Sequence, residues 1–136
     1  MTLLEEIQAK CSPELIAARD DYTITQTVNA GRVRPQSFTG GIGSIMRALG
    51  PVDGATFLDT LEYLAATQPT IKWAMRLIEA GNLDFGDVAV RAQIDGMVPS
   101  LLTTERAAAL KALGEVADPV QLDDVSRALN AAGIGV

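Results

Sequence analysis

The segment that most constrains the fold is residues 69–80, PTIKWAMRLIEA, because its apolar residues repeat with helical spacing. One apolar stripe stands at i, i+3, i+4 and i+7: Ile71, Ala74, Met75 and Ile78. A second stripe lies beside it: Trp73, Leu77 and Ala80. A helix with so wide an apolar surface is typical of the centre of a bundle, where other helices touch it on several sides. Trp73, the only tryptophan, is the largest side chain available for the core.

The rest of the chain reads as further short helices separated by glycine and proline. The 136 residues suit one domain, and 48% of them are apolar while only 4% are aromatic. Such a composition favours helices that pack closely through small residues. The sequence therefore predicts an all-α fold: one compact bundle of seven or eight short helices, forming a single helical domain over residues 1–136. No apolar run approaches 18 residues, so no membrane-spanning segment is expected.

Local signals place several helix starts. Ser12 followed by Pro13 predicts an N-cap and a first helical residue. Asp118, Pro119 and a glutamine at 121 form the same kind of signal, so Asp118 is expected to cap the last helix. Residues 22–28 fit both a helix and a strand, and the stop signal at 29–31 favours the helix.

Residues 31–43, GRVRPQSFTGGIG, form the one longer loop of the predicted fold. Pro35 disfavours helical conformation at the preceding residue, so residues 33–39 read as an extended loop or a short edge strand. Long loops in compact domains often bind partners. Arginine and aromatic residues are enriched at interface hot spots, which makes Arg32, Arg34 and Phe38 the candidate partner-contact residues. The alternative is that Phe38 fills a gap in the core and the loop is a structural strap.

The residue inventory argues against enzymatic chemistry. The chain has no histidine and one cysteine, Cys11, so an ordinary zinc site and a triad of the usual kind are unavailable. The glycines of residues 40–44 lack the lysine of a phosphate-binding loop and are interpreted as a tight turn with positive φ. Asp84-Phe85-Gly86 matches a kinase metal-binding triplet, but the chain is too short for a kinase, and a helix cap beside a buried phenylalanine is favoured. No catalytic, cofactor-binding or metal-ligating residue is predicted, and no cofactor.

A formal net charge of −6 argues against nucleic-acid binding by general electrostatics. Residues 122–133, LDDVSRALNAAG, resemble the first helix of some repressor headpieces, although Asp123 and Asp124 would repel phosphates. A small regulatory protein that binds nucleic acid or a transcription factor is therefore the alternative hypothesis.

Several pieces spread over most of the chain carry a resemblance to a family. They are IAARDDYTI at 16–24, GGIGSIMRALG at 40–50, FLDTLE at 57–62, IKWAMRLIEAGNLDFG at 71–86, RAQIDGM at 91–97, LTTERAAALKALGEVADPV at 102–120 and VSRALN at 125–130. Together they resemble small proteins encoded in the tail-region gene clusters of tailed bacteriophages and prophages. The resemblance implies a virion or virion-assembly role in the tail, implies no activity, and carries over no functional residue.

The leading hypothesis is therefore a non-enzymatic structural or assembly protein of a phage particle that acts through protein–protein contacts. Its expected partners are other virion proteins or further copies of itself, without a membrane. Its expected location is the host cytoplasm during assembly and the virion afterwards.

Overall fold

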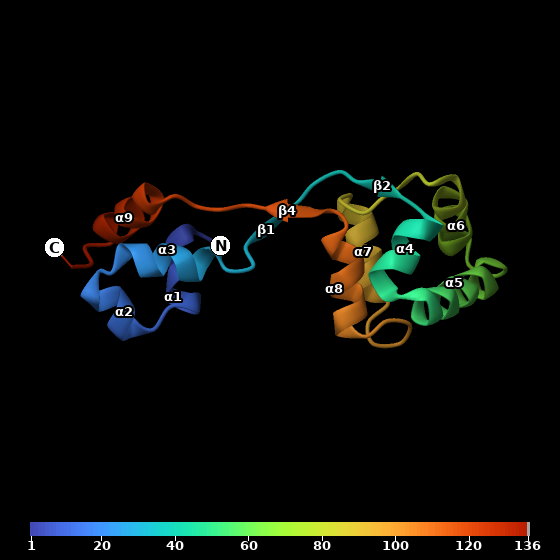
Figure 1. Ribbon diagram of the computed structural model, residues 1–136, viewed down its shortest axis with the longest axis horizontal. Coiled ribbons are helices and arrows are strands. Elements are labelled where there is room, and N and C mark those ends of the chain that lie inside the picture. Colours follow the sequence, from blue (N-terminus) through green and yellow to red (C-terminus); the bar gives the residue numbers. More distant parts are fainter. Residues whose placement is uncertain (136) are drawn as a thin grey trace. The chain divides into compact units, whose positions relative to one another are not determined.

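The computed structural model of the protein describes residues 1–135 (Figure 1). The described residues form nine helices: α1 (Leu3–Lys10), α2 (Pro13–Ala18), α3 (Asp21–Asn29), α4 (Ile42–Leu49), α5 (Pro51–Ala65), α6 (Pro69–Ala80), α7 (Val88–Gly96), α8 (Thr104–Ala112) and α9 (Leu122–Ala131). They also form four short strands: β1 (Val33–Pro35), β2 (Thr39–Gly40), β3 (Leu83–Asp84) and β4 (Glu115–Ala117). The prediction of a helix-dominated fold is confirmed. It needs one correction, because β1 pairs with β4 and β2 with β3 in two small sheets.

The chain divides into two compact units, which corrects the prediction of one bundle with one core. Unit 1 contains residues 1–34 and 117–135, and unit 2 contains residues 35–116. The core of unit 1 consists of Ile7, Cys11, Ile16, Ile24, Val28, Val125 and Leu129. The core of unit 2 is a separate cluster built from α4–α8 and β3. The physical reason is the lack of a buried side chain anywhere in residues 33–39 or 115–121, so neither crossing between the units continues a core.

The predicted helix start at Ser12 and the helix over residues 22–28 are confirmed. The Ser12 hydroxyl accepts a hydrogen bond from the Leu15 N–H at 3.2 Å, with Pro13 at the first helical position. Residues 22–28 lie within α3, where Asp20 accepts from the Thr23 N–H at 3.3 Å. Asx and hydroxyl caps satisfy N–H groups that have no partner inside the helix, which explains why these local signals are reliable.

The predicted cap of the last helix is wrong. Helix α9 begins at Leu122, and its N-terminus is closed by Asp124, whose carboxylate accepts from the Gln121 N–H at 3.0 Å. Asp118 instead accepts from the Arg32 guanidinium at 2.9 Å. The Asn29 side chain also holds the Val120 backbone, donating to its carbonyl at 3.0 Å and accepting from its N–H at 2.8 Å. These tertiary hydrogen bonds keep residues 118–120 extended and delay the helix.

Two carboxylates tie the helices of unit 1 together. The Asp21 carboxylate on α3 accepts from Arg19 through two bonds of 2.9 Å and from the Ser126 hydroxyl of α9 at 2.7 Å. Glu6 on α1 accepts from Lys10 at 2.9 Å and from Arg32 at 3.1 Å. Hydrogen bonds from Arg19 hold the pKa of Asp21 below its ordinary value of 3.8, and those from Lys10 and then Arg32 hold the pKa of Glu6 below 4.5.

We expect acid to destabilise unit 1. A carboxyl group whose pKa is lower in the folded state stabilises the fold at pH values above its ordinary pKa, and this contribution disappears as the pH falls through the folded-state pKa. The melting temperature followed by circular dichroism should therefore drop as the pH falls below 4.5. The double variant Glu6→Gln, Asp21→Asn should have a lower melting temperature at neutral pH, and its melting temperature should fall less on acidification. Parallel pH profiles for the two proteins would contradict this assignment.

Unit 2 contains two helix pairs joined through α4. Helix α5 packs on α6 and on α4, while α7 packs on α8, and α4 also contacts α8. Strands β2 and β3 pair antiparallel, with Thr39 opposite Asp84 and Gly40 opposite Leu83. This places the N-terminus of α4 against the end of α6, where a Cβ on Gly41 would meet the Ile78 carbonyl and would lie 2.9 Å from the Gly81 Cα. Close approach, and not positive φ, is thus what glycine provides at this position, because φ of Gly41 is −157°.

Candidate functional site

The structure divides the three predicted contact residues between the units. Arg32 is mostly buried in unit 1, where it binds Glu6 and Asp118. Arg34 is exposed, and its Nε lies 3.9 Å from the same Asp118 carboxylate. Phe38 belongs to unit 2, is 41% exposed, and lies beside the buried ring of Phe85 with 6.3 Å between ring centroids. Arg32 therefore has a structural role within its unit, whereas Arg34 and Phe38 keep exposed surface and their role as contacts stays a prediction.

The part of the loop that belongs to unit 2 is fastened along its length. The Asp84 carboxylate accepts from the Ser37 hydroxyl at 2.9 Å, from the Phe38 N–H at 3.0 Å and from the Gly86 N–H at 2.9 Å. The backbone bonds from Phe38 and Gly86 lower the pKa of Asp84. Asp84 thus secures the loop, and the cap of α7 is Asp87, which accepts from the N–H groups of Ala89 and Val90. The sequence suggested a helix cap within Asp84-Phe85-Gly86 beside a buried phenylalanine. Phe85 is buried, but the cap is Asp87, three residues after Asp84.

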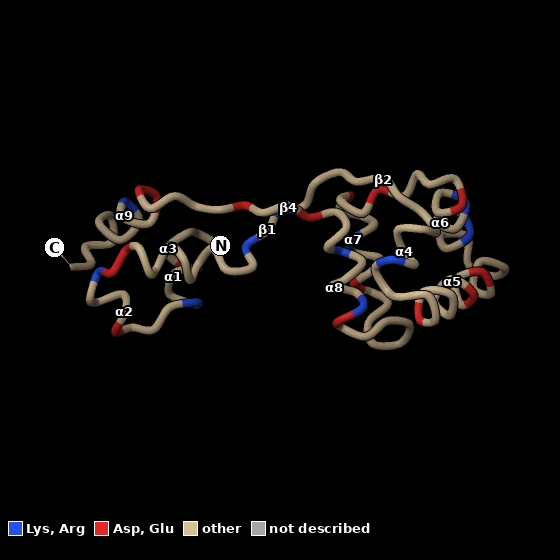
Figure 2. The backbone as a smooth tube through the Cα atoms, viewed as in Figure 1, with Lys and Arg blue, Asp and Glu red and all other residues tan. Residues whose placement is uncertain are grey.

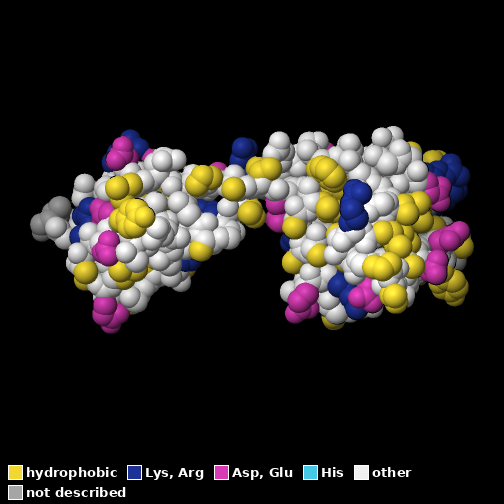
Figure 3. All heavy atoms as spheres, viewed as in Figure 1, with side chains coloured by type: hydrophobic (Ala, Val, Ile, Leu, Met, Phe, Trp, Pro, Cys, Tyr) yellow, Lys and Arg dark blue, Asp and Glu magenta, His cyan; other side chains and the backbone are white. Residues whose placement is uncertain are grey.

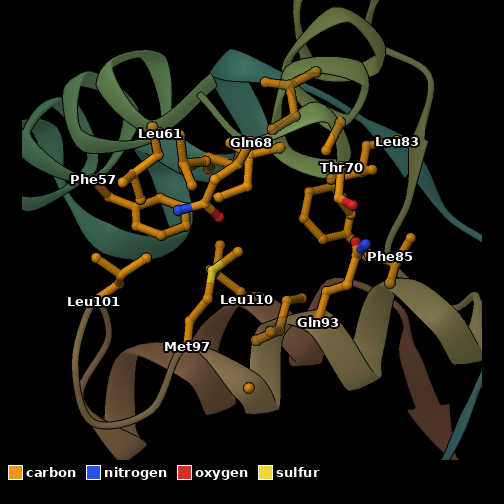
Figure 4. A pocket seen from close by; sticks show the side chains of 18 of the residues that line it. Phe57, Leu61, Gln68, Thr70, Leu83, Phe85, Gln93, Met97, Leu101 and Leu110 are labelled. Atoms are coloured by element: carbon orange, nitrogen blue, oxygen red, sulfur yellow. The ribbon is translucent and has the colours of Figure 1, made fainter. Parts of the chain in front are cut away.

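Unit 2 contains a cavity of about 530 Å³ between the α5–α6 pair and the α7–α8 pair (Figure 4). Buried apolar side chains form its floor: Ile45, Phe57, Leu61, Ile78, Leu83, Phe85, Ile94 and Leu110. Exposed, uncharged polar side chains stand at its mouth: Gln68, Thr70, Gln93 and Ser100. In Figure 4 the Gln68 amide points into the cavity, and the polar ends of Thr70 and Gln93 point toward one another from opposite sides. The cavity therefore has an apolar interior and a neutral hydrogen-bonding rim.

The lining of this cavity determines what it can do chemically. None of the residues that line it carries an ionisable side chain. General acid–base catalysis needs a titratable group within reach of the reacting atoms, and a serine or threonine hydroxyl needs a neighbouring base to act as a nucleophile. The volume falls in the roughly 300–1,000 Å³ range of ligand pockets. The cavity is thus suited to binding apolar groups.

Beside the cavity, α6 exposes apolar side chains that the sequence pattern placed in the core. Trp73 is 55% and Leu77 47% exposed, whereas Met75 and Ile78 are buried. The Arg76 guanidinium lies 4.6 Å and the Lys72 ammonium 5.4 Å from the centroid of the Trp73 ring. The expectation of a central helix touched on several sides is therefore wrong, because α6 packs on α5 and β3 with one stripe and presents the other to solvent.

The sequence contained a signal for this site that was interpreted as burial. Two apolar stripes on one twelve-residue helix exceed what a two-layer packing needs. An apolar stripe left over after packing is a candidate binding surface. The remaining lining residues come from α4, α5, β3, α7, α8 and the connections between them. The apolar period of one helix cannot show that these elements converge.

Comparison with protein-family models, with characterised proteins and with solved structures finds no match for the chain. Within residues 1–135, no helix has the length and apolar character needed to cross a bilayer. The described part of the chain also contains no cluster of three or more Cys, Asp or Glu side chains arranged to hold a metal ion.

Proposed function

We propose that the protein is a non-enzymatic structural or assembly component of a tailed bacteriophage particle, associated with the tail, and that it acts through protein–protein contacts. The observation that carries the proposal is the neutral apolar cavity of unit 2 with the exposed Trp73 and Leu77 beside it. Exposed apolar surface of this kind marks interaction sites on soluble proteins. The resemblance of most of the chain to tail-region proteins supplies the phage context.

The partners are other virion proteins or further copies of the chain. Interfaces are enriched in tryptophan and arginine, and a central anchor that fills a pocket usually carries most of the binding energy. The cavity provides such a pocket, and Trp73 with Arg76 provides such a pair on the adjoining helix. The protein would meet its partners in the host cytoplasm during assembly and remain with the particle.

The distribution of charge favours protein partners over nucleic acid. Eight of the eleven Lys and Arg side chains lie within 4.0 Å of a carboxylate: Lys10, Arg19, Arg32, Arg34, Arg91, Arg106, Lys111 and Arg127. Figure 2 shows blue and red positions interspersed along both units. Binding to phosphates depends on cations that are free to replace condensed counterions. A chain of net charge −6 with most of its cations already paired offers few of them.

Deletion of the gene from an inducible prophage, followed by analysis of purified particles, tests the proposal. With the wild-type gene, mass spectrometry should find the chain in the particles and enriched in the tail fraction. Without it, the titre of infectious particles should fall, and expression of the wild-type chain from a plasmid should restore the titre. The proposal would be contradicted if deletion left the titre unchanged and particles made with the wild-type gene did not contain the chain.

A further inference from the structure

The exposed stripe of α6 runs directly along the mouth of the cavity. Thr70, Trp73, Ala74 and Leu77 stand at i, i+3, i+4 and i+7, so their side chains form one continuous row along the helix. Thr70 and Ala74 line the cavity, while Trp73 and Leu77 are exposed. We refer to these four residues as the α6 row. Because its members share one helical face, the apolar surface inside the cavity continues outward over Leu77 to the Trp73 ring.

One side of the α6 row is bordered by two cations that form no salt bridge among the described residues, with Glu79 one turn beyond Arg76 on the same helix. Lys72 and Arg76 both lie against the Trp73 ring, and no carboxylate of the described residues comes within 4.0 Å of either. The one other cation in this condition is Arg47 on α4. Figure 2 shows the blue positions of α6 close together with a red one beside them, and in Figure 3 dark blue side chains gather at the place of α6 next to magenta ones. In an acidic protein, two unpaired cations stacked on an exposed indole form a local positive edge.

We propose that the cavity and the α6 row bind an acidic amphipathic helix of a partner virion protein. This inference rests on the proposed function and adds the chemistry of the partner. A groove between helix pairs receives the apolar face of a helix through anchors spaced at i, i+3 or i+4, and i+7. One large apolar side chain of the partner enters the cavity, where the amides of Gln68 and Gln93 surround it. The next anchors cover Leu77 and Trp73, and Asp or Glu side chains beside them meet Lys72 and Arg76.

Charge complementarity decides between this occupant and the others. A basic partner would place like charges against Lys72 and Arg76, which is unfavourable at an interface. A second copy of this chain would have to present an acidic helix with apolar anchors at helical spacing. On α5, which carries three carboxylates, the exposed apolar residues Val52 and Tyr63 stand eleven positions apart, and the anchor positions between them are held by Thr56 and Asp59. A small apolar molecule would fill the cavity but leave Trp73, Leu77 and both cations uncovered.

The single tryptophan makes the test direct, since Trp73 lies within the proposed surface. Two synthetic helical peptides of about 18 residues, or five turns, are used as probes. Both lack tryptophan and share one Leu/Phe face, and they differ in carrying Glu or Lys at the flanking positions. The acidic peptide should shift the Trp73 emission to shorter wavelength in a saturable manner and bind about tenfold more tightly than the basic peptide, as expected when two exposed charge pairs change from attractive to repulsive.

Charge-reversal variants provide the matched control. Lys72→Glu combined with Arg76→Glu should reverse the preference between the peptides, whereas Arg47→Glu, which removes an equally unpaired cation on α4, should leave the preference unchanged. The inference would be overturned if the two peptides bound equally well or if the acidic peptide did not bind. It would also be overturned if the preference for the acidic peptide did not depend on Lys72 and Arg76. Light scattering that shows self-association abolished by the double variant would also overturn it, in favour of a second copy. The proposed function is tested separately by the protein content of the particles. If the chain is found in particles but binds neither peptide, only this inference is refuted.

Discussion

Replacing Phe85 with alanine is expected to lower the free energy of unfolding of unit 2 by about 3–5 kcal/mol. Phe85 is 1% exposed and belongs to the same buried cluster as Ile78 and Leu110. Removing its ring deletes a large buried apolar surface and leaves a cavity that the surrounding helices cannot fill. Urea denaturation followed by the fluorescence of Trp73, which lies in the same unit, should show the loss as a lower midpoint.

Phe38→Ala is the matched control for Phe85→Ala. The two rings are tilted by 46° with 6.3 Å between their centroids, but Phe38 is 41% exposed. Its removal should therefore cost mainly the aromatic pair interaction of about 0.5–1.5 kcal/mol. This comparison also decides between the two interpretations of the loop. If Phe38→Ala destabilised unit 2 as much as Phe85→Ala, Phe38 would be a core residue and its role as a partner contact would be untenable.

Gly114→Ala and Gly86→Ala are expected to destabilise unit 2 by about 1–3 kcal/mol each, or more. A Cβ on Gly114 would collide with the backbone of Phe85 and Gly86, and one on Gly86 would collide with the backbone of Gln36. The Gln36 N–H in turn donates to the Gly114 carbonyl at 2.8 Å. Backbone cannot move aside as a flexible side chain can. The three backbone segments around Gln36, Gly86 and Gly114 would therefore have to move apart.

Gly43→Ala tests whether this loss comes from crowding. Gly43 lies within α4, and a Cβ there would meet nothing within 4 Å. Alanine in a helix is favoured over glycine by roughly 0.5–1 kcal/mol, so this variant should be as stable as the wild type or more so. The melting temperatures of Gly114→Ala, Gly86→Ala and Gly43→Ala show whether the loss of stability comes from backbone crowding. Equal destabilisation by all three would show that close backbone approach is not what the glycines provide.

The helices of this protein could be predicted from the sequence because their signals are local. The period of the apolar residues predicts α6 over residues 69–80, and Ser12 followed by Pro13 predicts the start of α2. The start of α9 could not be predicted in the same way. The side chains that hold residues 118–120 extended belong to Asn29 and Arg32, and nothing near Asp118 in the sequence reveals them.

The division into two units was missed for a related reason. Apolar periodicity shows that a helix has a buried face, but it does not show which other helix covers that face. Val125 and Leu129 of α9 are fully buried against residues from the first 28 positions of the chain. The two cores can be distinguished only by contacts between residues about a hundred positions apart in the sequence, such as those of α9 with the first 28 residues.

The candidate site was predictable in part. The second apolar stripe of α6 is visible in the sequence, and the structure shows that it is exposed. The yellow side chains that gather over α4 and α5 in Figure 3 are further apolar surface of unit 2, with Val52 76% exposed. The cavity depends on the convergence of six elements, and its neutral rim of Gln68, Thr70, Gln93 and Ser100 follows no spacing rule. Arg32, in contrast, was singled out for its type and proved to be bound within its own unit.

The central claim is that the cavity of unit 2 is the contact that incorporates the protein into the particle. Ala74 is half-buried in the lining, so Ala74→Phe places a ring in the cavity without enlarging the core. Ala108→Phe makes the same change on the exposed side of α8. The decisive measurement is the titre restored to a deletion prophage by each variant, with circular dichroism confirming that both fold. We predict that Ala108→Phe restores the titre and Ala74→Phe does not. Equal restoration by the two variants would contradict the account.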